Sequence, residues 1–321
     1  MATLARSLDE LIIKKPTSFK GLTVFPVVLV SQDFARSAEE FNVLGTGRVN
    51  QHINPLETGT LNRIKVTNRA KTRAIIMDGT TVQGGAANRM FLSSAILGHN
   101  EVVELPVCSV EQGRWEIMTS TSGKSYITTK DVTFRRSEFS PAAIRRLKFS
   151  KSTASLEKKP EMAVDQDSVW KEVKSQLAQA QVKSGTADVH SLYSHWIYIL
   201  FMFTARFRPI PGQIGLLSFM DKFTWYADFF INESTLQKAY DGLIKSYAVE
   251  ALARAARESS AKEAEQEHAE DVLAALRLAK LKEYSFPGST VKGTYFINSK
   301  RAVGTALMDG DLALYSTACS K

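Results

Sequence analysis

Residues 74–94 read AIIMDGTTVQGGAANRMFLSS, and this stretch decides how the N-terminal half of the chain is built. Two apolar runs, 74–77 and 90–92, flank a connection that contains three glycines, an asparagine and an arginine. Short apolar runs separated by glycine-containing turns are typical of paired β-strands. A plain hairpin needs only one or two special turn residues, so the composition of this connection asks for a further explanation.

The same pattern recurs from the start of the chain to about residue 134. Short runs rich in β-branched residues, bounded by Gly, Asn and Asp, lie at 21–31, 62–68, 73–77, 101–108 and 125–134. No helical period competes with them before about residue 140. The sequence therefore predicts a β-rich N-terminal half, built as a sandwich or a barrel-like sheet.

The second half of the chain changes to a helical period. Helices are predicted at 166–182, 188–206, from about 234 and at 260–282, and a β-hairpin is predicted from 214–220 and 224–230. The helix at 188–206 is apolar almost all round, so we expect it to be buried. Strands return at 294–299, 301–308 and 312–318. The predicted class is α+β, with a helical segment, an inserted hairpin and C-terminal strands.

The positive charge of the chain is concentrated between these halves. Residues 135–161 hold eight Lys or Arg against three Glu, within a net charge of +8. Their Ser and Lys content favours a solvated basic linker between a β-rich region (1–134) and an α+β region (162–321) that packs with it as one unit. Nucleic-acid binding is the alternative, but the segment lacks the interleaved aromatic residues used for base stacking.

Several classes of protein are disfavoured by what the sequence contains. Its longest apolar run, 196–203, is far shorter than a bilayer span, so no membrane partner is expected. Two cysteines make no disulfide framework, and no signal peptide is recognised, so the expected location is cytoplasmic. The five histidines show no metal-ligand spacing, and there is no Walker or Rossmann glycine motif. No metal is expected, and the cofactor and the oligomeric state stay undetermined.

The glycine-rich connection could bind an anion. Gly84 and Gly85 permit unusual backbone angles and could turn N–H groups towards a ligand. Arg89 fits a carboxylate or a phosphate, and Asn88 can donate and accept at one place. Asp78 could orient Arg89 or act as a base. The alternative is a turn tied together by an Asp–Arg pair.

Two further segments carry reactive residue types. The stretch VCSVEQGRW (107–115) places Glu111, Arg114 and Trp115 just past a strand, where a carboxylate, a guanidinium and a stacking ring could meet a ligand. Its cysteine, Cys108, lies in an apolar strand, where a free thiol is usually part of the core. Asp228, in the strand YADFF, is either a structural carboxylate or a site carboxylate.

These motifs together resemble the ARG-and-rhodanese-phosphatase-superfamily-associated protein domain family, in which ARG means ADP-ribosylglycohydrolase. The family pattern has DGE, a GGkQNR box, PVSCVErGRW, a VW helix and aDlF followed by LlrSYalDAl. Here these appear in order as 78–79, 84–89, 106–115, 169–170, 227–230 and 243–252. The sequence departs from the pattern at Ala87, which replaces the Gln, and at Cys108-Ser109, which stand in swapped order.

The resemblance implies a link with ADP-ribose and NAD metabolism, without an established reaction. We therefore expect a small anionic ligand, ADP-ribose-like or nucleotide-like, with hydrolysis of that ligand as a further option. Gly84, Gly85, Asn88, Arg89, Arg114 and Trp115 are the expected binding residues, and Asp78, Glu111 and Asp228 are the expected acid/base residues. A non-catalytic structural or interaction module is the alternative. Nucleic-acid binding through the basic linker is a weaker one.

Overall fold

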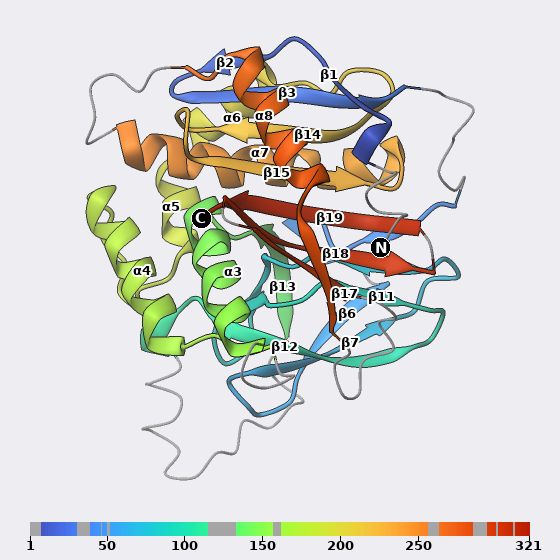
Figure 1. Ribbon diagram of the computed structural model, residues 1–321. Helices are drawn as coiled ribbons and strands as arrows, with labels where there is room; N and C mark the ends of the chain where they lie inside the picture. The colour runs from blue at the N-terminus through green and yellow to red at the C-terminus, as the bar shows by residue number, and fades with distance from the viewer. Residues whose placement is uncertain are drawn as a thin grey trace. The chain divides into compact units, whose positions relative to one another are not determined.

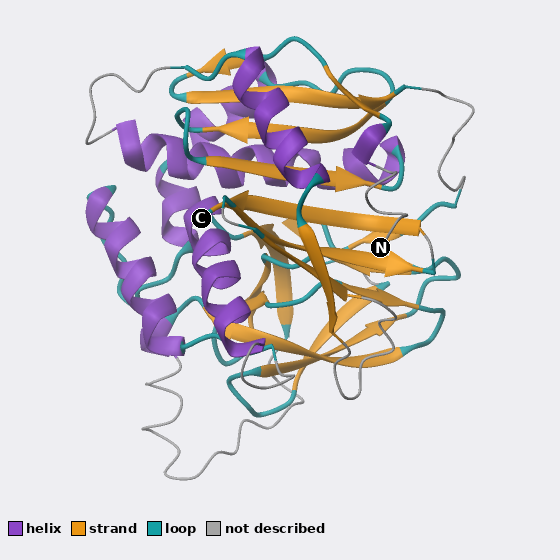
Figure 2. Cartoon of the chain, viewed as in Figure 1, coloured by secondary structure: helices purple, strands orange, loops and turns teal. Residues whose placement is uncertain are grey.

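The computed structural model describes residues 8–30, 39–45, 47–49, 52–114, 133–156, 162–255, 263–284, 294–299, 301–310 and 312–321. The chain divides into two compact units. Unit 1 comprises Met1–Glu40, Tyr198–Ser285 and Val291–Lys321, and unit 2 comprises Phe41–Ile197 and Phe286–Thr290. Both units contain strands and helices, so the fold is α+β as predicted (Figure 2). That the regions 1–134 and 162–321 pack as one unit stays a prediction.

Unit 1 contains a nine-stranded antiparallel sheet in its described part. Its order is β1-β3-β14-β15-β19-β18-β17-β16, and β2 also pairs with β3 (Figure 1). The strands are β1 (Leu11–Ile13), β2 (Thr17–Phe19), β3 (Leu22–Leu29), β14 (Gln213–Phe219), β15 (Trp225–Phe230), β16 (Lys280–Tyr284), β17 (Thr294–Asn298), β18 (Ala302–Asp309) and β19 (Leu312–Ser320). The predicted hairpin is β14–β15, and the predicted C-terminal strands are β17, β18 and β19. All of them are confirmed.

Helices cover both faces of this sheet. They are α6 (Ile197–Arg206), which begins at the boundary with unit 2, α7 (Glu233–Ala255) and α8 (Gln266–Arg277). On one face, Trp225 and Phe229 of β15 pack in one cluster with Leu273 of α8. On the other face, Asp228 of β15 meets Tyr247 of α7. Because successive strand residues point to opposite faces, a strand covered on both sides is buried at every position, as β15 is.

Unit 2 contains a seven-stranded sheet of order β5-β13-β9-β10-β12-β7-β6 and a three-stranded sheet of order β11-β8-β4 in the described part. A further bridge between Leu56 of β6 and Thr133, just before β13, makes the larger sheet barrel-like. The strands are β4 (Asn42–Val43), β5 (Gly47–Arg48), β6 (Ile53–Glu57), β7 (Arg63–Asn68), β8 (Ala74–Ile76), β9 (Thr80–Gly84), β10 (Arg89–Phe91), β11 (Ala95–Leu97), β12 (Val102–Ser109) and β13 (Phe134–Phe139). The helices are α3 (Ala142–Leu156), α4 (Gln166–Gln179) and α5 (His190–His195).

The structure corrects the expectation of a solvated linker at 135–161. Most of this segment forms β13 and α3, and 157–161 lies outside the described residues. Arg145 and Lys148 are buried, and Lys148 Nζ lies 2.8 Å from Asp78 Oδ2. Charge counted along the sequence does not distinguish a solvated cation from one that neutralises a buried carboxylate. These two cations are therefore not available to a nucleic acid.

A second correction concerns the apolar helix predicted at 188–206. It is two helices, α5 and α6, separated at Trp196. Its expected burial is wrong for α6, because Tyr198 is 87% exposed and Phe201 is 71% exposed. No helix within the described ranges has the length and apolar character needed to cross a bilayer.

Candidate functional site

The loop between β9 and β10 owes its glycines to its own shape. Gly84 has φ +124° and Gly85 has φ +64°, which residues with a Cβ rarely adopt. A Cβ on Gly84 would lie 2.3 Å from Thr133 O, and one on Gly85 would lie 2.4 Å from Glu57 Oε1. The N–H of Gly84 donates to Asn88 Oδ1 at 2.9 Å, and that of Gly85 donates to Thr133 O at 3.3 Å. Both N–H groups expected to face a ligand are thus used inside the protein.

Asn88 connects this loop to two other segments. Its Oδ1 accepts a hydrogen bond from Arg114 Nη2 at 2.6 Å in addition to the one from Gly84. Its Nδ2 donates to Asp188 Oδ1 at 2.9 Å, and its backbone N–H donates to Glu111 Oε2 at 3.1 Å. A single residue therefore fixes the position of one guanidinium and two carboxylates.

Glu111, just past β12, has both carboxylate oxygens engaged. Oε2 accepts from Arg114 Nε at 2.9 Å and also from Arg114 Nη2, while Oε1 accepts from Thr186 Oγ1 at 2.7 Å. Glu111 also forms a β-bridge with Asp188, which holds the segment before α5 against the end of β12. The side chain of Arg114 is 34% exposed, and no described residue accepts a hydrogen bond from its Nη1. Glu111 thus positions Arg114 and leaves one edge of the guanidinium open.

Asp188 is held through one of its two oxygens. Oδ1 accepts from Asn88 and from the backbone N–H of His190 at 3.1 Å, and it lies 2.9 Å from His190 Nδ1. On the far side of the ring, His190 Nε2 lies 2.7 Å from Thr81 Oγ1, which donates to Glu138 O at 2.8 Å. Burial raises the pKa of Asp188, but the hydrogen bond and charge of His190 outweigh it and hold the pKa below its usual value.

A β-bulge in β13 brings two arginines to the same place. Phe134 pairs with Gly84 and Arg136 pairs with Gln83, so Arg135 is an extra residue in the strand. Regular alternation would send Arg135 and Arg136 to opposite faces of the sheet. A bulge re-aims a side chain, and here both exposed arginines line one pocket. Among the residues that the structure describes, neither has an ion-pair partner.

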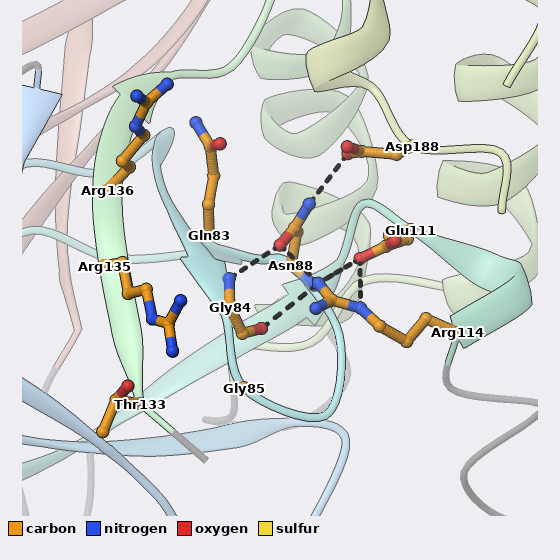
Figure 3. Close-up of a pocket in the computed structure, with 10 residues that line it drawn as sticks. All are labelled: Gln83, Gly84, Gly85, Asn88, Glu111, Arg114, Thr133, Arg135, Arg136 and Asp188. Carbon is orange, nitrogen blue, oxygen red and sulfur yellow. Dashed lines mark hydrogen bonds and ion pairs between the residues drawn. The ribbon is translucent and has the colours of Figure 1, made fainter.

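These segments surround a pocket of about 550 Å³ that lies wholly within unit 2 (Figure 3). Every lining residue that the structure describes is glycine, polar or charged. The lining consists of Gln83, Gly84, Gly85, Asn88, Glu111, Arg114, Thr133, Arg135, Arg136 and Asp188. Of the residues expected from the sequence, Gly84, Gly85, Asn88, Glu111 and Arg114 meet here.

Arg89 does not line this pocket, although the sequence placed it among the binding residues. Its side chain is fully buried, and its Nη1 donates to Ala87 O at 2.8 Å. Nη2 lies 3.7 Å from Glu57 Oε1, and that oxygen also accepts from the N–H of Ala86 at 2.8 Å. Burial lowers the pKa of Arg89, and Glu57 partly offsets this. The arginine and the glutamate together fix the base of the loop.

Two of the expected acid/base residues are also buried away from the pocket lining. Asp78 is fully buried against Lys148, and its backbone N–H donates to Ser94 Oγ at 3.1 Å. Asp228 lies in unit 1, where Tyr315 Oη donates to its Oδ1 at 2.6 Å and Tyr247 Oη donates to its Oδ2. Between the two readings of Asp228, this enclosure favours the structural one.

Two further residues considered in the sequence analysis are Trp115 and Cys108. Trp115 lies outside the described residues, so its stacking role stays a prediction. Cys108 is buried, and burial raises the pKa of its thiol to about 12. A thiol with that pKa is a poor nucleophile at neutral pH, in line with the core role expected for it.

Sequence reasoning missed three charged residues of the pocket, and the signal for each was weak. Asp188 stands in ADVH, where only His190 two positions later hints at a pair. Arg135 and Arg136 fall within the segment predicted as a basic linker, and nothing in their sequence marks a bulge. Within the described residues, no group of His, Cys, Asp or Glu is arranged to hold a metal ion.

Comparison with known proteins gives one result. The family model of the ARG and Rhodanese-Phosphatase-superfamily-associated Protein domain matches residues 10–319. No curated protein and no solved structure matches the chain. The matched range includes all described lining residues of the pocket and extends over both units.

Proposed function

Since the chain belongs to the ARG and Rhodanese-Phosphatase-superfamily-associated Protein domain family, we propose that its unit 2 pocket binds a small phosphate-containing anion, ADP-ribose-like or nucleotide-like. The family name associates such domains with ADP-ribosylglycohydrolase and phosphatase superfamilies. That association suggests phosphorylated ligands to test and assigns no reaction to this chain.

One observation carries the proposal, namely three guanidiniums at one open pocket. Arg114 presents its Nη1 edge, and the β-bulge adds Arg135 and Arg136. Guanidinium groups bind phosphate and carboxylate oxygens through paired hydrogen bonds, which an ammonium group does not match. The lining holds these three arginines against two carboxylates, Glu111 and Asp188, so positive charge is in excess at the pocket.

Hydrolysis of the bound ligand is a separate part of the proposal. Its candidate acid/base residues differ from those expected from the sequence. Asp78 and Asp228 are enclosed, so neither reaches a ligand in this pocket. Glu111 positions Arg114 and Asn88, and Asp188 is the remaining carboxylate in the lining. Trp115 stays the sequence-based candidate for stacking on a base.

Both cysteines are buried free thiols, which supports a reducing compartment such as the cytoplasm.

The alternative of a structural or interaction module has its own support. Arg89 with Glu57 and Lys148 with Asp78 are buried pairs that hold motif residues in place. The test must therefore separate loss of binding from loss of folding.

Isothermal titration calorimetry with ADP-ribose, AMP, ADP and inorganic phosphate tests binding by the full chain. We expect the double variant Arg135→Gln/Arg136→Gln to weaken every phosphorylated ligand by about 10- to 100-fold, since a hydrogen bond to a charged group contributes about 1.5–3 kcal/mol. The matched control is Arg69→Gln/Lys71→Gln, which removes two exposed cations of unit 2 that do not line the pocket. Chromatography of the same mixtures after incubation tests for hydrolysis.

Two results would count against the proposal. The first is a wild-type protein that binds no phosphorylated compound in the panel, which would favour the structural module. The second is equal loss of binding in the pocket variant and in the control, which would mean that the arginines act only through net charge.

A further inference from the structure

We propose that this pocket selects a phosphorylated sugar, with Asp188 Oδ2 accepting a hydrogen bond from a sugar hydroxyl while the arginines hold the phosphate. This inference rests on the proposed function and adds the class of ligand. It also adds a specificity-determining residue that the sequence motifs do not contain.

Asp188 supplies the one open carboxylate oxygen among the described lining residues. Its Oδ1 is occupied by Asn88 and His190, but no described residue donates to its Oδ2. Glu111 differs, because both of its oxygens are engaged. An ionised carboxylate can only accept hydrogen bonds, so the group that it recognises must be a donor. A sugar hydroxyl is such a donor, and a phosphate oxygen would be repelled.

Asp188 and two of the three pocket arginines lie at different places around the loop. Figure 3 shows Asp188 on one side of Asn88 and the β13 arginines, Arg135 and Arg136, on the other. A ligand that spans the pocket therefore places its phosphate towards β13 and its hydroxyl towards Asp188. Inorganic phosphate alone would satisfy only the first of these contacts.

The position of Asp188 is fixed without the ligand. Asn88 Nδ2 and His190 hold Oδ1, and the β-bridge to Glu111 fixes the backbone. His190 is itself anchored on Thr81, so the carboxylate has little rotational freedom to lose when a ligand binds. A fixed acceptor of this kind discriminates against ligands that lack the matching donor, because Oδ2 would then accept no hydrogen bond from the ligand.

The described part of the lining offers no apolar or aromatic side chain on which the base of a nucleotide could stack. Every described lining residue is glycine, polar or charged, whereas nucleobases are bound by stacking on apolar or aromatic side chains. Apart from Trp115, which lies outside the described residues, nothing here favours a base, so we expect the affinity to come mainly from the sugar phosphate.

The test compares two phosphate monoesters, ribose 5-phosphate and methyl phosphate, which differ in the sugar. We expect the wild-type full chain to bind ribose 5-phosphate about 10- to 100-fold more tightly. Asp188→Asn should remove this difference without weakening methyl phosphate. The control is Asp167→Asn, an exposed carboxylate of unit 2 outside the pocket, which should keep the wild-type difference. AMP, GMP and CMP should differ by less than about tenfold.

Each other outcome has a definite meaning. If no phosphorylated ligand binds the wild type, the proposed function itself fails. If ligands bind but methyl phosphate equals ribose 5-phosphate, the pocket recognises phosphate only and the inference is overturned. Equal weakening of both esters by Asp188→Asn would make Asp188 a structural residue. Affinities for AMP, GMP and CMP that differ by more than about tenfold would assign the selectivity to the base. The wild-type comparisons keep their force even if the Asp188 variant folds poorly.

Discussion

Arg114 Nη2 donates a hydrogen bond to Asn88 Oδ1 at 2.6 Å, and this contact joins the two glycine-containing motifs of the sequence into one site. Asn88 belongs to the loop after β9, and Arg114 follows β12. Because Asn88 Oδ1 also accepts from Gly84, the conformation of the loop and the position of the guanidinium depend on the same atom. The shape of the loop and the placement of the pocket arginine are therefore coupled.

Replacing Asn88 should disturb both the shape of the loop and the position of the Arg114 guanidinium. We expect Asn88→Ala to lower the free energy of unfolding by about 1–3 kcal/mol, because the N–H of Gly84 loses a partly buried acceptor. The same change should weaken phosphorylated ligands, since Arg114 loses one of its supports. Urea unfolding measures the first effect and calorimetry the second. Asn62→Ala, at an exposed position, is the control and should match the wild type.

For Arg89 the expected effect is on folding. Arg89→Ala leaves the carboxylate of Glu57 buried without its cation, which costs about 3–5 kcal/mol for a pair of this kind. We expect a large drop in the urea midpoint, with Arg69→Ala as the exposed control. Arg114→Ala should lower the free energy of unfolding much less than Arg89→Ala does, because the side chain of Arg114 is partly exposed. It should weaken ligand binding more. A stable Arg89→Ala protein that has lost only its ligand would restore the binding role read from the sequence.

The sequence predicts strands better than it predicts which of them meet. The hairpin β14–β15 was predictable because both strands and the turn between them are local. The pairing of β3 with β14 was not, because it joins the N-terminal segment to the second half of the chain. For this reason unit 1 takes residues from both ends, a division that no composition shift along the chain marks.

The same limit applies to the candidate site. Loop residues such as Gly84, Asn88 and Arg114 were visible because their types are unusual between apolar runs. The sequence does not show which of these residues are buried, so it does not separate Asp78 and Arg89 from the residues that line the pocket. Asp188 and Arg135 come from segments without a motif, and only a β-bridge and a β-bulge bring them to it.

Asp228 in unit 1 provides a test of the distinction between buried structural residues and residues that bind a ligand. It is enclosed by Tyr247 and Tyr315, so we expect Asp228→Asn to lower stability while leaving the affinity for phosphorylated ligands unchanged. The reason is that the carboxylate accepts from both hydroxyls, and an amide can accept only through its oxygen. Thermal unfolding and calorimetry on the same sample measure the two quantities. Lost affinity at unchanged stability would instead make Asp228 a site carboxylate.

The buried thiol of Cys108 should be unreactive in the folded protein. Burial raises its pKa to about 12, and the charges of Lys148 and Arg89 only partly oppose this. Iodoacetamide at mildly alkaline pH should therefore leave Cys108 unmodified until urea is added, and Cys108→Ala should bind ligands like the wild type. Labelling of the native protein at Cys108, followed in peptides by mass spectrometry, would contradict the assignment to the core.

The raised pKa also predicts how stability changes with pH. Between about pH 9 and about pH 12 the unfolded chain loses the Cys108 proton while the folded chain retains it. The folded state then binds more protons, so the stability contributed by the protonated thiol is fully present below about pH 9 and is lost as the pH rises towards 12. Tyr240, whose pKa burial also raises to about 12, adds to the same decline and is unchanged by a substitution at Cys108. The wild type should therefore lose stability more steeply than Cys108→Ala across this window, and parallel curves would show that the thiol is not shielded from solvent.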